Sequence, residues 1–582
     1  MAVENTNYEK ILKQRWGYDS FRPLQKEIIE SVCSGTDTLA ILPTGGGKSL
    51  TYQVPAMVLD GVVIVVSPLI ALMTDQVESL KKRGIRAVVI HAALSHNKIF
   101  DILEQAQYGA YKLIYVSPER LQSSFFLTRL QFINISLIAV DEAHCISEWG
   151  YDFRPSYLKI SDLREQYPNV PILALTASAT PVVQKDICSK LKMANYNHFQ
   201  TGIERDNLYY VVRNTKDKDA ELYKILTAVN GSSIVYTRTR LQAEQLAQIL
   251  QKTGLSADFY HAGLDSFQRD KRQNAWMEGK TQILCSTNAF GMGIDKPDVR
   301  VVVHYDIPDA LEQYYQEAGR AGRDGKKSYA VLLVTDSSIE RLLHRHEQVF
   351  PPKEYVRNVY QQLANYFVIG VYSGEGAVFP FNLEQFCHTC HLSYSQVLAS
   401  LNILQWAGYI TLVDEMENAS KLKVLLPPSK LFDWRMTQPD SDPILEAFLR
   451  VYTGIFSDYQ HVSEDYIAKA LGIDRNKIYN HLLNLSNQGV VDYIPFKRSP
   501  LIIYNTPRLE AEELFIPKSA YESRIDYLYE RLLSMYNYVS SKKECRSVLL
   551  AKYFGQENPK PCGHCDYCLS LSVAGRSAAS HD

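Results

Sequence analysis

The chain lacks the two kinds of segment that direct a protein into or across a membrane. It contains no run of 18 or more apolar residues and no basic-then-apolar amino terminus, which are the marks of a membrane span and of a secretory signal. A surplus of basic residues is also missing, because 62 Lys and Arg stand against 64 Asp and Glu. We therefore expect a cytoplasmic protein without membrane contact, in which any site for a polyanion comes from a local basic patch.

Low-complexity tracts are absent as well, and the composition is that of an ordinary globular protein, with 46% hydrophobic and 22% charged residues. A chain of 582 residues is too long for one core, so we expect three to five domains. Without a secretory signal, the ten cysteines point to reduced thiols or a metal site rather than to disulfides.

Short apolar segments alternate with helical segments along the first 340 residues. In the first half they lie at 38–42, 62–66, 87–90, 112–116, 137–140 and 172–175, and in the second at 233–236, 257–260, 282–285 and 301–304. Most of them lead into a small polar loop and a helix, which is the pattern of a doubly wound parallel sheet. The fold class is therefore α/β, with two lobes.

A phosphate-binding loop, PTGGGKS at 43–49, follows the first of these strands. Its glycines let backbone N–H groups approach the phosphates of a nucleotide, Lys48 reaches the β- and γ-oxygens, and Ser49 can hold Mg²⁺. The strict motif has a glycine at the position of Leu42, so this loop is a variant. The ATP-binding residues predicted here are Thr44, Gly45, Gly46, Gly47, Lys48 and Ser49.

Two acidic residues follow the strand at 137–140. Residues at the carboxyl ends of parallel strands face a ligand crevice. Asp141 would hold Mg²⁺ there, and Glu142 would orient a water molecule on the γ-phosphate. Alone, such a pair is more often a turn at the end of a strand, and the phosphate loop before it favours the catalytic interpretation.

An aromatic segment comes directly after the acidic pair. Arg154 stands among four rings, those of Trp149, Tyr151, Phe153 and Tyr157. Rings and a guanidinium can stack on flat bases, so the segment predicts a platform for single-stranded nucleic acid. The alternative is a loop that packs on the protein surface.

The second lobe has no phosphate loop of its own, but it carries QEAGRAGR at 316–323. We expect a helix there, on which Arg320 and Arg323 share a face. An arginine that one lobe supplies to a phosphate bound by the other stabilises the transition state only when the lobes close. The alternative is a surface charge pair.

Residues 18–335 resemble the superfamily-2 helicase core and, specifically, the RecQ family of ATP-dependent DNA helicases. The resemblance is carried by FRPLQ, PTGGGKS, DEAHCISEWGYDFRPSY, ALTASAT, YHAGL, STNAFGMGIDKPDVR and YYQEAGRAGRDG. It implies two RecA-like lobes that couple ATP hydrolysis to 3′-to-5′ movement on single-stranded DNA and to separation of forked duplexes. Ala318 stands where the family usually has threonine, a change too small to threaten activity.

The resemblance also assigns individual residues. It implies adenine contacts by Tyr18, Arg22 and Gln25, although on the residues alone Arg22 and Gln25 could equally serve to cap the helix that follows. It implies DNA sensing by a second set of side chains, those of Trp149, Phe153 and Arg154.

The part beyond residue 340 departs from the family's usual order, in which a zinc module follows the core directly. Residues 381–428 predict two helices and then paired strands at 409–413 and 422–426, a winged-helix pattern. The pattern recurs at 462–504, with Lys497 and Arg498 at the tip of the wing. Winged helices bind duplex DNA in some proteins and are spacers in others, and both possibilities stay open.

Four cysteines near the end of the chain, Cys545, Cys562, Cys565 and Cys568, match a closed tetrahedral zinc site with a structural role. We expect a basic cluster beside it, Lys542, Lys543 and Arg546, to contact DNA. The string CHTCH at 387–391 matches a haem attachment motif, but it lies in an amphipathic helix, and ordinary core cysteines are favoured over haem or a second metal.

The predicted domains are a first RecA-like lobe (1–205), a second lobe (206–340), a helical linker with a first winged helix (341–435), a second winged helix (436–510), a zinc-binding helical module (511–570) and a disordered tail (571–582). The expected cofactors are ATP, Mg²⁺ and Zn²⁺, and the expected state is a monomer, associated with the nucleoid in a bacterium. Two competing functions remain: an RNA helicase, and a DNA-binding scaffold whose ATPase is dead.

Overall fold

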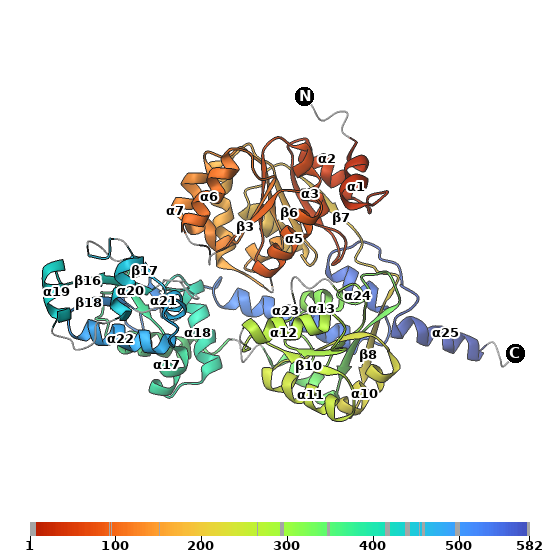
Figure 1. Cartoon of the computed structure of the whole chain (residues 1–582). Coiled ribbons are helices and arrows are strands. Elements are labelled where there is room, and N and C mark those ends of the chain that lie inside the picture. Colours follow the sequence, from red (N-terminus) through yellow and green to blue (C-terminus); the bar gives the residue numbers. More distant parts are fainter. Residues whose placement is uncertain are drawn as a thin grey trace. The chain divides into compact units, whose positions relative to one another are not determined.

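The computed structural model divides the chain into two compact units, residues 1–346 with 524–582, and residues 347–523 (Figure 1). None of the described helices combines the length and the apolar composition that crossing a membrane requires. The residues described are 7–91, 94, 96–150, 152–264, 266–291, 296–345, 350–413, 420–436, 443–452, 454–456, 460–494 and 501–578.

The first lobe is a seven-stranded parallel sheet with the strand order β3-β4-β2-β5-β6-β1-β7. Its strands are β1 (Asp37–Ile41), β2 (Val62–Val66), β3 (Ala87–Ile90), β4 (Leu113–Val116), β5 (Ile135–Val140), β6 (Ile172–Thr176) and β7 (Tyr196–Gln200). Six of them were predicted. The polar edge strand β7 was not, because its sequence YNHFQ lacks the apolar run of a buried strand.

Helices cover both faces of this sheet, as a buried parallel sheet requires. One core contains side chains from α2 to α5, including Ile28, Tyr52 and Met73, and the other contains side chains from α6 to α9, including Phe126 and Ile187. The helical elements are α1 (Tyr8–Trp16), α2 (Gln25–Cys33), α3 (Leu50–Gln53), α4 (Pro55–Val58), α5 (Ile70–Lys82), α6 (His96–Gln107), η1 (Pro118–Gln122), α7 (Ser124–Leu130), η2 (Ala143–Ile146), η3 (Pro155–Lys159), α8 (Ile160–Gln166) and α9 (Pro181–Lys190), where η marks 3₁₀ turns.

The second lobe repeats the design with a six-stranded parallel sheet in the order β10-β11-β9-β12-β13-β8. Its strands are β8 (Leu208–Asn214), β9 (Ser232–Tyr236), β10 (Ala257–Tyr260), β11 (Ile283–Ser286), β12 (Val299–His304) and β13 (Ser328–Val334). Its helices are α10 (Lys218–Ala228), α11 (Arg240–Lys252), α12 (Ser266–Met277), α13 (Leu311–Ala318) and α14 (Asp336–Leu343).

The end of the chain returns to this lobe. Helices α23 (Glu522–Ser540), α24 (Arg546–Tyr553) and α25 (Asp566–Ala578) follow the second unit. Side chains from α23 and α24 share one core with α12 and α13, on the face of the sheet that α10 and α11 leave uncovered. Residues 571–578 belong to α25, so the predicted disordered tail is wrong over these residues.

Residues 347–523 contain two small three-stranded antiparallel sheets, ordered β14-β19-β15 and β17-β16-β18. The strands are β14 (Val378–Pro380), β15 (Ile410–Val413), β16 (Ser420–Val424), β17 (Gln460–Val462), β18 (Val491–Ile494) and β19 (Leu501–Tyr504). The helices are α16 (Lys353–Tyr366), α17 (Leu383–Cys390), α18 (Tyr394–Trp406), α19 (Pro428–Met436), α20 (Pro443–Val451), α21 (Glu464–Leu471) and α22 (Arg475–Asn487).

The strand pairing corrects the predicted arrangement of the winged helices. β15 pairs with β19 rather than with the neighbouring β16, and β16 pairs with β18. The segment from β16 to β18 is therefore a domain of its own, inserted between strands β15 and β19 of the first winged-helix domain. The predicted boundary at 435/436 falls inside α19, whose Leu431 belongs to the core of the inserted domain. Lys497 and Arg498 lie outside the described residues.

Candidate functional site

The phosphate loop joins the carboxyl end of β1 to the short helix α3. Gly45 and Gly47 both have φ of 76°, a left-handed conformation that favours glycine. A Cβ atom on Gly47 would stand 2.5 Å from the Nε2 of Gln25, so this position has no room for a side chain. The loop is therefore built from backbone, with its N–H groups available to an anion.

Gln25 holds this loop from the start of α2. Its buried amide donates to the carbonyls of Gly46 (3.1 Å) and Gly47 (3.0 Å), and its Oε1 accepts from the backbone N–H of Arg22 (2.9 Å). The Arg22 guanidinium donates to the carbonyl of Gly45. In this state both side chains bind the phosphate loop, while Tyr18 is 55% exposed nearby in the chain. The predicted adenine contacts of the three residues remain a prediction.

The acidic pair stands at the carboxyl end of β5, as expected. Asp141 is buried, and its burial together with the charge of Glu142 raises its pKa to about 6. Burial would also raise the pKa of Glu142, but the positive charges of Lys48, His144 and Arg320 outweigh burial and lower it. Glu142 has φ of 47°, and its Oε1 lies 3.6 Å from the Nζ of Lys48.

The second lobe reaches the phosphate loop through the segment 319–323. A Cβ on Gly45 would lie 3.4 Å from Cγ of Arg323, and a Cβ on Gly319 would lie 3.1 Å from Cβ of Thr44. The Nε2 of Gln316 donates to the Oγ of Ser178 in the first lobe (2.8 Å). The structure thus brings together the predicted catalytic residues of the two lobes. The first lobe contributes Lys48, Asp141 and Glu142, and the second contributes Arg320 and Arg323.

One local prediction in this segment is wrong. The helix ends at Ala318, so Arg320 and Arg323 lie in turns after α13 rather than on a shared helical face. Gly319 caps the helix, and Gly322 has φ of 64°, which helices do not adopt. Two glycines within four residues favour the turn over the helix.

The aromatic segment is less open than predicted. Tyr157 is fully buried and its hydroxyl donates to the carbonyl of Asp141 (3.0 Å), so it supports the acidic pair and is no part of a stacking surface. Tyr151 lies outside the described residues. Trp149, Phe153 and Arg154 are half-buried, and the Nζ of Lys190 stands 5.7 Å from the centre of the Phe153 ring.

Arg154 connects this segment to the catalytic turn. Its guanidinium donates to Asp152 and to the carbonyl of Pro68 (3.2 Å), and its backbone N–H donates to the carbonyl of Cys145 (2.8 Å). The thiol of Cys145 donates to the same Asp152 carboxylate (3.6 Å). Arg154 and Asp152 are therefore both hydrogen-bonded to Cys145 of η2, the turn that directly follows Glu142.

Sequence reasoning missed the partner of Trp149. Its ring packs edge-on against Tyr527 of α23, with 5.3 Å between the ring centres, and Arg524 of the same helix forms an ion pair with Glu148. Arg531, two turns beyond Arg524 on the same helix, is paired with the buried Glu312 of α13 at 3.4 Å. No local signal could have found these residues, because they lie more than 370 positions from Trp149 in the chain.

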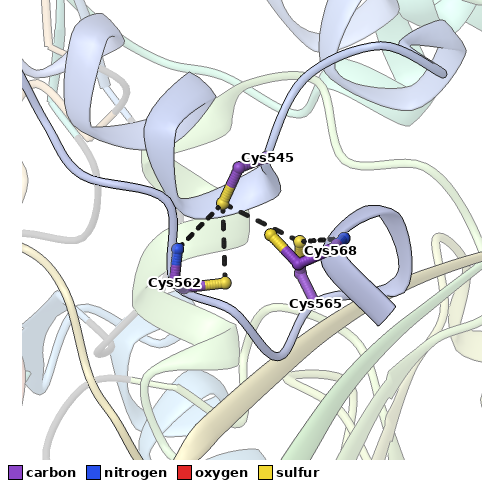
Figure 2. A group of neighbouring side chains, drawn as sticks. All are labelled: Cys545, Cys562, Cys565 and Cys568. Carbon is purple, nitrogen blue, oxygen red and sulfur yellow. Dashed lines mark hydrogen bonds between the residues drawn. The ribbon is translucent and has the colours of Figure 1, made fainter. Parts of the chain in front are cut away.

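The four predicted zinc ligands converge, as Figure 2 shows. The Sγ of Cys545 lies 3.5 Å from that of Cys562 and 3.8 Å from that of Cys565, and all four sulfur atoms lie within 4.8 Å of one another. Four ligands at a Zn–S bond of about 2.3 Å are about 3.8 Å apart in a tetrahedron. The thiols thus fit a structural zinc ion with no position left for water.

The residues around this site fasten it to the second lobe. Asp566 accepts from the Arg546 guanidinium (2.9 Å) and from the backbone N–H of Val212 on β8 (3.1 Å). His564 is hydrogen-bonded to the carbonyl of Leu208 (3.2 Å). Arg546 is 5% exposed, so the prediction that it contacts DNA is wrong, and of that cluster only Lys542 and Lys543 are exposed.

The CHTCH string lies on α17, in which Cys387 is buried. Among the described residues it joins no group of three or more possible metal ligands. Cys387 has the burial of a core cysteine, whereas Cys390 is only partly buried.

Comparison with protein families matches four parts of the chain. They are a DEAD/DEAH box helicase domain at 22–187, a helicase conserved C-terminal domain at 217–325, a RecQ helicase winged-helix domain of Bacteroidota at 422–495, and a RecQ zinc-binding domain at 510–569. The third match begins and ends with the inserted domain, which agrees with the strand pairing.

Curated relatives match the helicase core. The chain is 44% identical over 340 residues to the probable ATP-dependent DNA helicase RecS of Bacillus subtilis, covering 58% of this chain and 68% of RecS. It is also 44% identical over 340 residues to the ATP-dependent DNA helicase RecQ of the same organism, of which it spans 58%. A putative ATP-dependent RNA helicase R290 of Acanthamoeba polyphaga mimivirus is 45% identical over 326 residues, which are 55% of this chain and 59% of that protein.

Among solved structures, the DUF1998 helicase MrfA bound to DNA superposes with a TM-score of 0.50 at 20% identity, covering 60% of this chain and 53% of MrfA. At that identity the likeness concerns the fold alone. Family models thus match the helicase domains and the zinc module, and a solved structure matches the two-lobed fold.

Proposed function

The chain belongs to the RecQ family of superfamily-2 ATP-dependent DNA helicases, and on that premise we propose that it moves 3′-to-5′ along single-stranded DNA and separates the strands of forked duplexes. We place this activity in DNA repair, recombination or replication, and we propose that the working form is a monomer that associates with the nucleoid if its host is a bacterium.

In this proposal the two lobes share the hydrolysis of ATP. Backbone N–H groups of the phosphate loop and Lys48 bind the phosphates, and Glu142 orients the attacking water. Arg323 and Arg320 stabilise the charge that develops on the transferred phosphoryl group. Lys48 now lies 3.6 Å from Glu142, so nucleotide binding would draw it toward the phosphates and release the carboxylate for the water.

A magnesium ion fits the same place. The donors offered are oxygens, the carboxylate of Asp141 and the hydroxyl of Ser49, which are the ligands that Mg²⁺ prefers. The buried Tyr52 stands in the same region, and burial, with Tyr115 and the charge of Asp141, raises the pKa of its phenol. Bound Mg²⁺ would neutralise charge on the phosphates, and Asp141 would orient it.

The single observation that carries the coupling to DNA is the bond network of Arg154. DNA that displaces this side chain from Asp152 frees the carboxylate that the Cys145 thiol also uses, and Cys145 lies three residues from Glu142. Stacking of bases on Trp149 and Phe153 would supply the displacing contact. We therefore propose that DNA binding and hydrolysis are linked through this segment.

The direction of movement can be tested on partial duplexes. With ATP, the protein should displace the strand from a duplex that has a 3′ single-stranded overhang, because a 3′-to-5′ motor loads there. The same duplex with a 5′ overhang is the control. Preferential unwinding of the 5′-overhang substrate, or equal unwinding of both, would refute the proposed direction.

The polymer can be tested by ATPase stimulation. We expect single-stranded DNA to accelerate phosphate release more strongly than RNA of the same sequence and length, at the same salt concentration. Stronger stimulation by RNA would favour the RNA helicase alternative, which the name of one relative also raises.

A further inference from the structure

The linker between the two lobes contacts the segment that carries the predicted catalytic arginines, in addition to joining the two sheets. Residues 201–207 join β7, the edge strand of the first sheet, to β8, the edge strand of the second. Any change in the angle between the lobes must pass through these residues. Ile203 of the linker is buried in the core that the second lobe shares with the zinc module.

At its far end the linker holds the arginine-bearing segment. The guanidinium of Arg205 donates through Nη1 to the carbonyl of Gly319 (3.0 Å) and through Nη2 to that of Gly322. These two carbonyls flank Arg320. Asn207 donates to Gly322 as well (2.7 Å) and to Lys326 (2.9 Å).

The two carbonyls need these donors because α13 has already ended at Ala318. Residues 319–323 have no helical scaffold of their own, yet they lie against the phosphate loop, with Gly319 beside Thr44 and Arg323 beside Gly45. A planar guanidinium with donors in a fixed fork can hold two carbonyls at a set spacing, which a lysine cannot do.

At its near end the linker is held by the zinc module. The side chain of Gln556 donates to Glu204 (2.6 Å) and accepts from the backbone N–H of Ile203 (3.4 Å), while Gln200 donates to the carbonyl of Phe554 (3.3 Å). The ring of Phe554 packs against Tyr315 of α13, with 5.1 Å between the ring centres. The turn 554–556 thus contacts both the linker and the helix that delivers the arginines.

We propose that Arg205 is a positioning residue for ATP hydrolysis, which fixes the segment carrying Arg320 and Arg323 on the phosphate loop and is itself anchored through Gln556 of the zinc module. The inference rests on the proposed role of these two arginines in hydrolysis. It also gives the zinc module a role in hydrolysis. If the module no longer contacts the linker, hydrolysis should slow although every group that touches the nucleotide is still present.

The test compares Arg205→Ala with Arg164→Ala in the full-length chain. Arg164 also donates to two carbonyls, those of Pro168 and Val170, and pairs with Asp37 at the end of β1 remote from the phosphate loop. We expect Arg205→Ala to lower the DNA-stimulated kcat for ATP by between about 10- and 100-fold with KM unchanged, since displaced catalytic groups cost rate rather than ground-state binding. Arg164→Ala should leave kcat at the wild-type value.

The affinity for a transition-state analogue distinguishes positioning of catalytic groups from a purely structural role, because a purely structural role would leave this affinity unchanged. Arg205→Ala should bind ADP with aluminium fluoride more weakly by a similar factor, while its affinity for a non-hydrolysable ATP analogue stays within about twofold. Arg205→Lys, which can reach one carbonyl but not hold both, should recover only part of the rate. Gln556→Ala should reduce kcat in the same direction by a smaller factor.

The double variant Arg205→Ala/Arg320→Ala separates the inference from the function on which it rests. If Arg205 acts by placing Arg320 together with Arg323, its loss should cost less rate in the Arg320→Ala background than in the wild-type chain, because only Arg323 is then left to misplace. Full turnover by Arg320→Ala would refute the role of the arginines. Four results would overturn the positioning role. Two concern the combination of variants: Arg320→Ala is slow while Arg205→Ala is normal, or the two losses are fully additive. The other two concern Arg205 alone: Arg205→Lys recovers the full rate, or Arg205→Ala loses affinity for the ATP analogue in parallel with rate.

Discussion

The two lobes have the same parallel-sheet design, but they bring opposite chemistry to the nucleotide site. The first contributes the phosphate loop at the end of β1 and two carboxylates at the end of β5, one of which has its pKa raised to about 6 by burial and by its neighbour. The second has no phosphate loop and contributes Arg320 and Arg323 from turns after α13. Binding groups and charge-stabilising groups are therefore divided between the lobes.

The lobes also differ in what supports them. The first lobe covers both faces of its sheet with its own helices. The second completes one of its cores with α23, α24 and the zinc-binding cysteines from the end of the chain. The difference teaches that the arginine-bearing lobe shares a core with the zinc-binding module, whereas the two cores of the phosphate-binding lobe are built from its own helices.

The largest effect should follow from loss of the metal. Cys565→Ser should cost the zinc ion and much of the folding free energy of the module, on the order of 10 kcal/mol for small zinc domains. Hydrogen exchange should then rise in β8, which Asp566 and His564 contact, while β1 stays protected.

Cys387→Ser on α17 is the matched control, and it should retain one zinc per chain by atomic absorption. Loss of zinc with Cys387 rather than with Cys565 would show that the wrong cluster was chosen. Equal loss of protection in both lobes would contradict the separate support of the first lobe.

Lys48→Ala should reduce hydrolysis to background, because the β- and γ-phosphates lose their cation while the loop keeps its fold. Nucleotide affinity should fall too, as this residue belongs to the binding lobe. The measurement is phosphate release with DNA, alongside binding of a fluorescent ATP analogue. Lys81→Ala, exposed on α5, serves as the control. DNA-stimulated turnover near the wild-type rate would remove the phosphate-loop assignment.

Arg323→Ala should distinguish the roles of the two lobes. Like Lys48→Ala, it removes a cation near the phosphates of ATP, but this cation belongs to the second lobe. We expect kcat to fall by at least about 1,000-fold, in the range known for arginine fingers, with nucleotide affinity close to wild type. Binding and single-turnover assays measure both quantities. A loss of affinity as large as that of Lys48→Ala would show that both lobes bind the ground state.

Trp149→Ala should uncouple ATP hydrolysis from DNA binding, while the protein still binds DNA. Backbone phosphate contacts dominate affinity, so DNA binding at fixed salt should change little, while DNA stimulation of hydrolysis and unwinding should fall together by about tenfold. Tyr108→Ala, an 81% exposed aromatic of the same lobe, is the control. Normal unwinding by Trp149→Ala would reduce this segment to packing against Tyr527.

The smallest effect lies outside the lobes. Val368 follows α16 with φ of 55° and is 89% exposed, although β-branched residues disfavour that conformation. Val368→Gly should therefore raise the free energy of unfolding of residues 347–523 by about 1 kcal/mol, as measured by denaturant titration. The ATPase should be unchanged, and a slower ATPase would show that this unit acts on the lobes.

The lobes and the site were largely readable from the sequence because their signals are local. Apolar strands followed by polar loops gave ten of the strands, and the phosphate loop and the acidic pair each lie within a few residues of a strand end. Three strands of the lobes were not predicted, namely β7, β8 and β13. Edge position alone does not explain this, because β13 is an interior strand and the edge strands β3 and β10 were predicted.

What failed depended on partners distant in the chain. The pairing of β15 with β19 spans the whole inserted domain, so no neighbouring pattern could indicate it. The burial of Arg546 and the contact of Trp149 with Tyr527 likewise follow from α23 and α25 returning to the first unit. Arg320 and Arg323 lie beside the phosphate loop and the acidic pair, but in a turn rather than on the predicted helix, because two glycines interrupt the segment.

Phosphate release by the wild-type chain, measured with Mg²⁺ and ATP in the presence and absence of single-stranded DNA, tests whether these groups form a working ATPase. We predict turnover that DNA accelerates and that Lys48→Ala abolishes. Release no faster than that of Lys48→Ala under either condition would contradict the shared catalytic site and would leave a DNA-binding scaffold in its place.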